Sequence, residues 1–488
     1  MKKLLLCFCI VFFVFEIQAH SGVVGSDSLT SAISKTDSAI SIPPLPVKKI
    51  TQLGSVYIPD FNFKNYLLKN TEINSNHDDL ISEQEAKQVT KLSVNALQIK
   101  DLTGIEAFTE LDYLNCSDNQ LSTLNISNNL KLSWLICSYN KISALDVEKN
   151  INLKDLDCEF NQISYLNLTK DSALTSIHCA RNMLSSLNLS ANIKLTDLDC
   201  DGNQIKELNL KANVALGRLI CSHNQLTALN LNFNEALSEL DCSRNQLTKL
   251  NVNANPLITI LYCNNNQITI LAVSTNEVLA DLWCHNNQLT SLNLRGTTGL
   301  MRLSCSDNKL TALNISTNKA LTALYCNNNQ IADLAVTDNV ALKEFGCSRN
   351  LLSALDVSTN NNLEELWCDY GQLTTLNLNN HKMLTGVWCY NNQLTTIDIS
   401  NSAALISLSC LNNQLTDLNL GANTALLYLW CQNNPNLKTV CLNPIQMALT
   451  NNVTSALEKD GTCSWSTKCE IPQPEAVKVS KKIKKRRK

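Results

Sequence analysis

The sequence predicts a repeat solenoid: stacked coils that share one parallel β-sheet face, mostly strand and loop, with little helix outside an N-terminal cap. Sixteen cysteines recur at a constant step of 21 residues, from Cys116 to Cys431. An asparagine follows each cysteine by three residues, from Asn119 to Asn434, and only Gly371 interrupts that row. Charged residues are 17% of the 488-residue chain, against an average of about 25%. One short period kept over most of a chain is the signature of a solenoid.

The N-terminus has the parts of a secretory signal. Two lysines precede an unbroken apolar run from Leu4 to Phe15, and Ala19 supplies a small residue at the cleavage point. The run is too short for a transmembrane anchor, which needs roughly 18 apolar residues. We therefore expect removal of residues 1–19 and a secreted or cell-surface protein. Residues 20–49, rich in small and hydroxyl side chains, are expected to form a flexible spacer.

Residues 50–91 are expected to form an N-terminal cap that contains a helix. Asp60 can cap this helix at its start. The apolar spacing predicts that Phe61, Tyr66 and Leu67 face the core.

A segment of this cap has the oxygen spacing of a calcium loop. Oxygen donors occupy positions 1, 3, 5, 9 and 12 of a twelve-residue loop, and a backbone carbonyl falls at position 7. Asp79 stands where such loops usually have glycine, so its backbone would be strained. The predicted ligands are Asn74, Asn76, Asp78, Leu80, Ser82 and Glu85. The alternative is a turn rich in Asn and Asp that leads into a helix at Ser82, with no cofactor required.

Residues 92–440 are predicted to form a solenoid of about seventeen coils. One unit has the form L-x-x-L-x-C-x-x-N-x-L-x-x-L-x-[LIV]-x-x-N-x-x, as in Leu111 to Lys131. Alternate side chains of a strand point to opposite faces, so Leu114 and Cys116 are expected inside and Asn115 outside. The asparagine after each cysteine turns the chain, and its amide can satisfy backbone groups that the bend leaves unpaired. The second half of the unit predicts a second extended segment, and sixteen units would extend roughly 75 Å.

This 21-residue, cysteine-bearing unit resembles the leucine-rich repeat of bacterial surface proteins of the internalin class. The first coil, Leu92 to Phe108, lacks the cysteine and is similar to the longer internalin-type repeat. The resemblance covers about Leu92 to Leu437, and residues 50–91 resemble the caps that precede such repeats. It implies a right-handed superhelix and a secreted or surface-displayed protein that binds a partner on its strand face.

The sixteen repeat cysteines are predicted to be buried free thiols. Side chains in register on parallel strands project side by side, which is a poor geometry for disulfides, and a single row does not converge as a metal site does. The C-terminal cap, residues 441–470, departs from the repeat. A Cys441–Cys469 disulfide would staple it, although Cys463 leaves the pairing open. Residues 471–488 are expected to form a disordered basic tail.

The residue between the leucine and the cysteine is expected to face solvent, and its neighbours two residues away share that face. Early coils carry acidic residues there and later coils carry aromatic ones. Four of the six tryptophans of the chain occupy this single position of the unit. Aligned aromatic side chains in solvent commonly mark a contact surface. The predicted partner-binding residues are Tyr262, Trp283, Tyr325, Trp367, Trp388, Trp430, Asp155, Asp157, Asp197, Asp199, Asp201 and Asp241.

These features predict a non-catalytic monomer that binds a protein partner on a host or cell surface. One alternative is a glycan-binding module, because flat rings stack on sugars. The other is a structural surface protein whose rings shield one another or a neighbouring molecule. An enzyme is not expected, since the six histidines are scattered over different coils and no phosphate loop or zinc spacing occurs. The net charge of −3 argues against a nucleic-acid partner.

Overall fold

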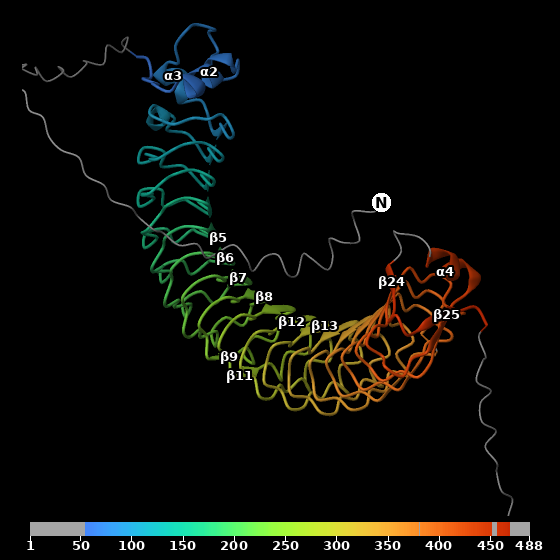
Figure 1. Ribbon diagram of the computed structural model, residues 1–488. Helices are drawn as coiled ribbons and strands as arrows, with labels where there is room; N and C mark the ends of the chain where they lie inside the picture. The colour runs from blue at the N-terminus through green and yellow to red at the C-terminus, as the bar shows by residue number, and fades with distance from the viewer. Residues whose placement is uncertain (1–53, 380, 451–455, 469–488) are drawn as a thin grey trace, which may run out of the picture. The chain divides into compact units, whose positions relative to one another are not determined.

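The computed structural model describes residues 54–379, 381–450 and 456–468. They belong to one compact unit, Thr51–Lys488. The predicted signal, spacer and basic tail lie outside the described residues. In the described part the chain winds into stacked coils, with short strands along one side of the stack (Figure 1).

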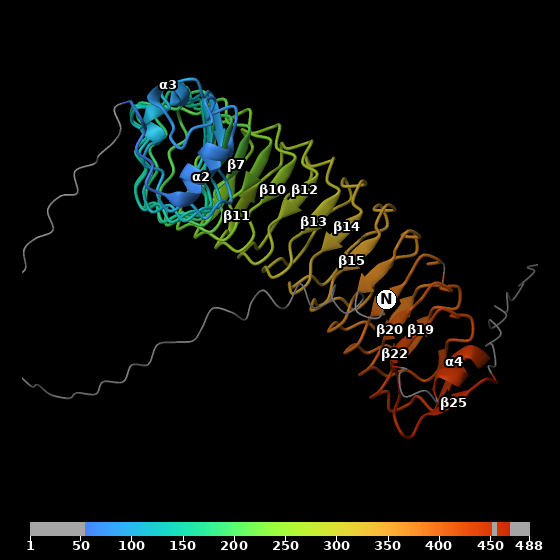
Figure 2. The same ribbon diagram turned by 90° about the horizontal axis from the view of Figure 1, so that it is seen from above.

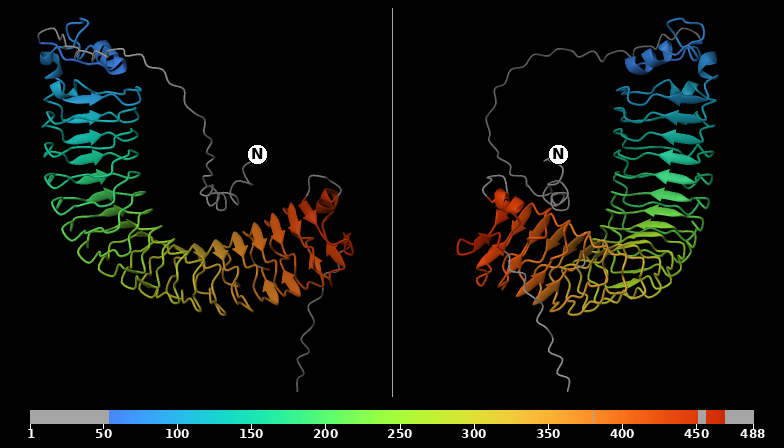
Figure 3. Two further views of the ribbon diagram at one scale, coloured as in Figure 1. Left: turned by 60° about the vertical axis from the view of Figure 1, so that its left-hand side comes forward. Right: turned by 90° about the vertical axis from the view of Figure 1, so that its right-hand side faces the viewer.

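A parallel sheet of 18 strands forms that side. Each strand pairs with the strand of the next coil, and in the cysteine-bearing coils the paired residues are 21 apart, as in Tyr113 with Trp134 (Figure 3). The predicted solenoid with a parallel sheet is confirmed. The strands are β1 (Lys91–Ser93), β2 (Tyr113–Asn115), β3 (Trp134–Ile136), β4 (Asp155–Asp157), β5 (Ser176–His178), β6 (Asp197–Asp199), β7 (Arg218–Ile220), β8 (Glu239–Asp241), β10 (Ile260–Tyr262), β12 (Asp281–Trp283), β13 (Arg302–Ser304), β14 (Ala323–Tyr325), β15 (Glu344–Gly346), β16 (Glu365–Trp367), β18 (Gly386–Trp388), β20 (Ser407–Ser409), β22 (Tyr428–Trp430) and β24 (Ala456–Glu458).

The core is built from rows of aliphatic side chains and thiols. Leu114 and Cys116 are fully buried, whereas Asn115 between them is half-buried. The sixteen repeat cysteines are all buried free thiols, as predicted. Full burial of one leucine side chain stabilises a fold by about 1.5–3 kcal/mol, so these repeated rows supply the main driving force for folding.

A row of asparagines joins each coil to the one before it. The amide nitrogen of Asn140 donates to the backbone oxygens of Cys116 and Cys137, at 3.0 and 3.1 Å. Its amide oxygen accepts from the backbone N–H of Leu121 at 2.9 Å. The same three contacts recur in later coils, for example at Asn329. One side chain thus satisfies three backbone groups of two coils, which confirms the role predicted for this residue.

A second row of asparagines lies in the other half of the coil. Asn150 is fully buried, and its amide nitrogen donates to the backbone oxygens of Ile126 and Asn129 in the preceding coil, at 3.1 and 2.9 Å. These bonds satisfy carbonyl groups that the tight turns would otherwise bury unpaired.

Asp171 occupies the next place in this second row. Its two carboxylate oxygens are buried and have no hydrogen-bond partner among the described residues. Burial raises the pKa of Asp171 to about 6, and the negative charges of Glu148 and Asp146 add to the rise. A carboxylate cannot donate hydrogen bonds as the asparagine amide does, so this position is a defect in the row.

The second half of the coil forms regular strands in some coils only. Helices are short, and in the described residues beyond the N-terminal cap they are limited to the turn η1 (Ile105–Ala107) and α4 (Pro444–Leu449). The second extended segment predicted for each coil is therefore paired as sheet in part of the solenoid. Its strands are β9 (Lys249–Asn251) with β11 (Ile270–Ala272), β17 (Thr375–Asn377) with β19 (Thr396–Asp398), and β21 (Leu418–Asn419) with β23 (Thr439–Cys441) and β25 (Ser464–Ser466).

The N-terminal cap contains helices α2 (Phe61–Lys69) and α3 (Glu83–Ala86) (Figure 2). Asp60 caps α2 by accepting two backbone N–H groups of its first turn, as predicted. Ser82 caps α3 by accepting the backbone N–H of Glu85.

The inward face of α2 differs from the prediction at one residue. Leu67 is fully buried and Tyr66 packs against the core, but Phe61 is 78% exposed. The prediction for Phe61 is wrong, because Phe63 and Leu67, four residues apart, share the inward face of the helix.

The C-terminal cap continues the coils as well as closing them. Strand β24 pairs with β22 and extends the main sheet, and β25 pairs with β23. The side chain of Gln446, fully buried in α4, donates to the backbone oxygen of Asn423 at 2.6 Å. Gln446 thereby pairs a buried backbone carbonyl of the preceding coil, as the asparagines of the second row do elsewhere.

Two cysteines of this cap differ in oxidation state. Cys441 is disulfide-bonded and Cys463 is a free thiol. The pairing of Cys441 with Cys469 stays a prediction, because Cys469 lies outside the described residues.

Asp171→Asn should stabilise the protein by about 1–3 kcal/mol at pH 7, because it restores two buried hydrogen bonds and removes a buried charge. The folded pKa of about 6 lies above the usual value of 3.8. The wild type therefore loses stability as pH rises through the interval between these values, and the variant does not. Urea unfolding at pH 4 and pH 7 measures the difference. Asn213→Asp, which introduces the same defect elsewhere, should destabilise at pH 7. Equal stability of wild type and Asp171→Asn at pH 7 would contradict the assignment.

Candidate binding face

Three side-chain positions per coil make up the strand face: the first and third residues of each main-sheet strand and the residue two beyond the third. The middle strand residue is buried beneath them in every main-sheet strand except β24, where Leu457 is half-buried. Each residue predicted to bind a partner lies at one of these positions. Asp155 and Asp197 are at the first position, Asp157, Asp199, Asp241, Tyr262, Trp283, Tyr325, Trp367, Trp388 and Trp430 are at the third, and Asp201 is at the last.

The aromatic side chains at the third strand position are half-buried, and each packs on another ring of the face. Trp367 and Trp388 stack, with ring centroids 5.1 Å apart and ring planes 7° apart. The ring of Tyr325 lies 6.3 Å from that of Trp367, and Tyr262 meets Trp283 edge to face at 5.8 Å. The rings are therefore less exposed than the sequence suggested, because neighbours one or two coils away cover part of each.

The acidic coils contain a cation that the sequence analysis missed. The guanidinium of Arg218 lies 3.0 Å from a carboxylate oxygen of Asp197, 3.5 Å from one of Glu239 and 3.9 Å from one of Asp199. The signal was present, since Asp197, Arg218 and Glu239 follow one another at the 21-residue step. Arg218 thus balances part of the negative charge of this section.

Burial and hydrogen bonding shift the pKa values of the acidic section in different directions. Burial raises the pKa values of Asp155 and Asp199. The imidazole of His178 lies 3.5 Å from an oxygen of Asp197. This contact raises the pKa of His178 and lowers the pKa of Asp197. His178 is therefore a cation of this section at mildly acid pH.

Two of the other predicted carboxylates bind neighbours in adjacent coils, whereas Asp241 accepts from the backbone N–H of Ser243 in its own coil at 2.9 Å. Asp201 accepts from Arg181 and His223, each at 2.8 Å. Asp157 accepts from the hydroxyl of Ser138 at 2.9 Å. These bonds join coils across the face and fix the orientation of the carboxylates.

The predicted calcium loop has its strongest ligand engaged in other bonds. One carboxylate oxygen of Glu85 accepts from the backbone N–H and the hydroxyl of Ser75, at 2.9 and 3.2 Å. The other accepts from the backbone N–H and the hydroxyl of Ser82, both at 2.9 Å. Burial raises the pKa of Glu85, but these hydrogen bonds together outweigh it and lower the pKa. Ser82 and Glu85 form the capping box of α3.

The rest of the loop is held by turn contacts. The amide nitrogen of Asn74 donates to the backbone oxygen of Asp78 at 2.8 Å, and that of Asn76 donates to the Asp78 carboxylate at 2.8 Å. His77 has the left-handed backbone, with φ of 59°, so the strain predicted at Asp79 is misplaced. The observed geometry is that of the turn leading into a helix, and calcium binding here stays a prediction.

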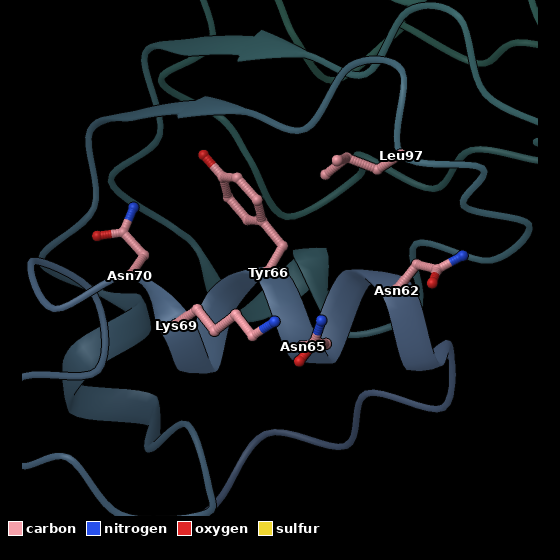
Figure 4. Close-up of a pocket in the computed structure, with 6 residues that line it drawn as sticks. All are labelled: Asn62, Asn65, Tyr66, Lys69, Asn70 and Leu97. Carbon is pink, nitrogen blue, oxygen red and sulfur yellow. The ribbon is translucent and has the colours of Figure 1, made fainter.

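The N-terminal cap also has a shallow hollow along α2, lined by Asn62, Asn65, Tyr66, Lys69, Asn70 and Leu97 (Figure 4). Its lining has one titratable nitrogen, that of Lys69, and no carboxylate. Across the described ranges, no three His, Cys, Asp or Glu side chains converge as a metal site would require. No described helix is long and apolar enough to cross a bilayer.

The two histidines of the strand face should titrate on opposite sides of the usual pKa of 6.5. His178 should titrate above it because of Asp197, and His285 below it because burial beside Trp283 disfavours the charged imidazole. Imidazole chemical shifts measured by NMR against pH give both values. The raised pKa of His178 adds stability that is full below pH 6.5 and lost as pH rises through the folded pKa.

Asp197→Asn is the matched variant for this titration. It should return the pKa of His178 toward 6.5 and leave His285 unchanged. Two histidines that both titrate at 6.5 in the wild type would contradict the geometry of the face.

Comparison with known proteins supports the architecture. The functional domain of InlJ from Listeria monocytogenes, which includes a cysteine ladder, shares 31% sequence identity; the match covers 78% of this chain and 80% of that one, with a TM-score of 0.64. The Leptospira interrogans leucine-rich repeat protein LIC12759 shares 21% identity over 78% of this chain and 97% of that one, with a TM-score of 0.62. The plant peptide hormone receptor RGFR1, solved in complex with RGF2, shares 19% identity over 72% and 69%, with a TM-score of 0.58. No family model and no curated protein sequence matches the chain. The extent of the match to InlJ, together with the row of buried cysteines, shows that the chain belongs to the leucine-rich repeat proteins of the internalin-like type.

Proposed function

We propose that this protein is exported and binds a protein partner, without catalysis, through the aromatic section of its strand face, from β10 to β22. The observation that carries the proposal is the alignment of Tyr and Trp side chains at the third strand position over these coils. The coil does not require aromatic residues there, since Ser304, Gly346 and Ser409 occupy the same position. Large rings kept half in solvent are typical of the energetically important residues of protein interfaces.

The ring geometry favours a protein over a glycan partner. Trp367 and Trp388 are stacked within 7° of parallel, so each uses one ring face on the other. Carbohydrate recognition uses an open ring face, and half of the faces in this pair are already covered. Ring edges and partly open faces suit apolar and cationic side chains of a protein.

The family membership and the N-terminal sequence support the remaining parts of the proposal. Leucine-rich repeat proteins commonly bind protein partners, and RGFR1 was solved with RGF2 bound. The basic start, apolar run and small residue at Ala19 support export. The open sheet face, with its aligned aromatic side chains, offers a broad surface for contact, which supports a binding role.

The double variant Trp367→Ala/Trp388→Ala should fold normally and lose at least tenfold in affinity for the protein partner. Tyr165→Ala is the matched control, because Tyr165 is 68% exposed and lies off the strand face. Pull-down from cell-surface extracts identifies candidate partners, and affinity is then measured by biolayer interferometry with each purified partner. Circular dichroism and thermal unfolding check the fold.

The same variants on a glycan array test the alternative. Loss of a glycan signal in the double variant, without any protein partner that depends on the two tryptophans, would replace the proposed function with carbohydrate binding. Full retention of protein capture in the double variant would refute the role of the aromatic section.

A further inference from the structure

The first strand position shows how the molecule balances carboxylates on its sheet. In β6 to β8 the guanidinium of Arg218 lies between the carboxylates of Asp197 and Glu239. In β12 and β13, Asp281 is paired by both of its oxygens with Arg302. In these places an arginine one coil away supplies the counter-charge.

The same position in β15 and β16 has two carboxylates and no arginine one coil away. Arg302, two coils before Glu344, is paired with Asp281 and acts on Glu344 only at longer range. Glu344 and Glu365 are directly paired residues of neighbouring strands. No arginine, lysine or histidine forms an ion pair with either of them within the described chain, and Lys343 pairs instead with Glu364 at 3.1 Å. Burial raises the pKa of Glu365, and the charges of Glu344 and Glu364 raise it further. Like charges facing each other across strands destabilise a sheet, so the fold alone gives no reason for this pair.

Aromatic residues lie next to these two carboxylates on the strand face. The hydroxyl of Tyr325 donates a hydrogen bond to Glu344. Trp367 is two residues beyond Glu365 on the same strand face, and its ring stacks on that of Trp388.

The ring of Trp388 lies over Gly386, the strand residue paired with Glu365. A Cβ atom at Gly386 would lie 2.5 Å from this ring, so the glycine makes room for it. Both carboxylates thus lie beside a packed group of rings, on a part of the face that remains open to solvent.

We propose that Glu344 and Glu365, with the rings of Tyr325, Trp367 and Trp388, bind a cationic side chain of the protein partner, either a lysine ammonium or an arginine guanidinium. The partner supplies the counter-charge that Arg218 and Arg302 supply elsewhere on the same sheet. Carboxylates attract the cation, and the electron-rich ring faces and the apolar stem of the side chain add contact. This inference rests on the proposed function and specifies the chemistry of the partner at that site.

The test uses the full mature chain and three small probes. Nα-acetyl-lysine methylamide and Nα-acetyl-arginine methylamide are titrated while the indole N–H resonances of Trp367 and Trp388 are followed by NMR. Nα,Nε-diacetyl-lysine methylamide is the neutral control. We expect saturable shifts at these two tryptophans with at least one cationic probe, and which probe binds more tightly distinguishes ammonium from guanidinium.

Glu344→Gln/Glu365→Gln should weaken the binding of the cationic probe at least fivefold while the fold and the stacked rings persist. Glu207→Gln/Glu277→Gln, which removes the same charge at two exposed positions off the strand face, should leave binding unchanged. Equal shifts with the neutral probe, equal weakening in the control variant, or no effect of Glu344→Gln/Glu365→Gln would each overturn the inference.

The two proposals fail separately. If Trp367→Ala/Trp388→Ala loses the protein partner but neither cationic probe binds, the cation site is wrong and the binding face stands. If a cationic probe binds at these glutamates but Trp367→Ala/Trp388→Ala captures the protein partner as the wild type does, the cation site is supported and the proposed function is wrong.

Discussion

The structure depends on one side-chain hydrogen-bonding arrangement, repeated in coil after coil: the amide of the asparagine that follows each cysteine. A chain that turns every few residues leaves backbone N–H and C=O groups without partners, and a buried unpaired group costs about 1–3 kcal/mol. Asn140 satisfies three such groups in two coils at once. Because each amide ties a coil to its predecessor, the coils are held at one spacing and one register. The alternation of buried and outward side chains follows from that register.

Departures from this arrangement are informative. Gly371 is the one interruption of the asparagine row between Asn119 and Asn434, and it follows Trp367 by four residues. Natural proteins tend to break local rules where function requires it. The unbalanced pair of Glu344 and Glu365 lies in the same coil and the one before. Irregularity of the repeat, unmatched charge and stacked rings therefore coincide in neighbouring coils.

The sequence predicted the scaffold well because the 21-residue step determines which residues are neighbours. Buried thiols, the inward leucines, the outward third position and the asparagine contacts all follow from strand alternation and that step. Contacts that depend on side-chain orientation were not predicted. Arg218 was overlooked although its place in the row was visible, and the stacking of Trp367 on Trp388 depends on ring orientation that a sequence does not give. The exposure of Phe61 depends on the direction in which α2 docks.

The most direct test of this account is the chemical accessibility of the repeat cysteines. Burial raises the pKa of Cys116 to about 12, and the thiols are closed to solvent from Cys116 to Cys431. Iodoacetamide labelling of the native protein at pH 8, mapped peptide by peptide by mass spectrometry, should leave all sixteen thiols unmodified. The same treatment in guanidinium should modify all sixteen. Rapid labelling of Cys368 and Cys389 in the native state would place the thiols outside and the neighbouring tryptophans inside, and would contradict the binding face itself.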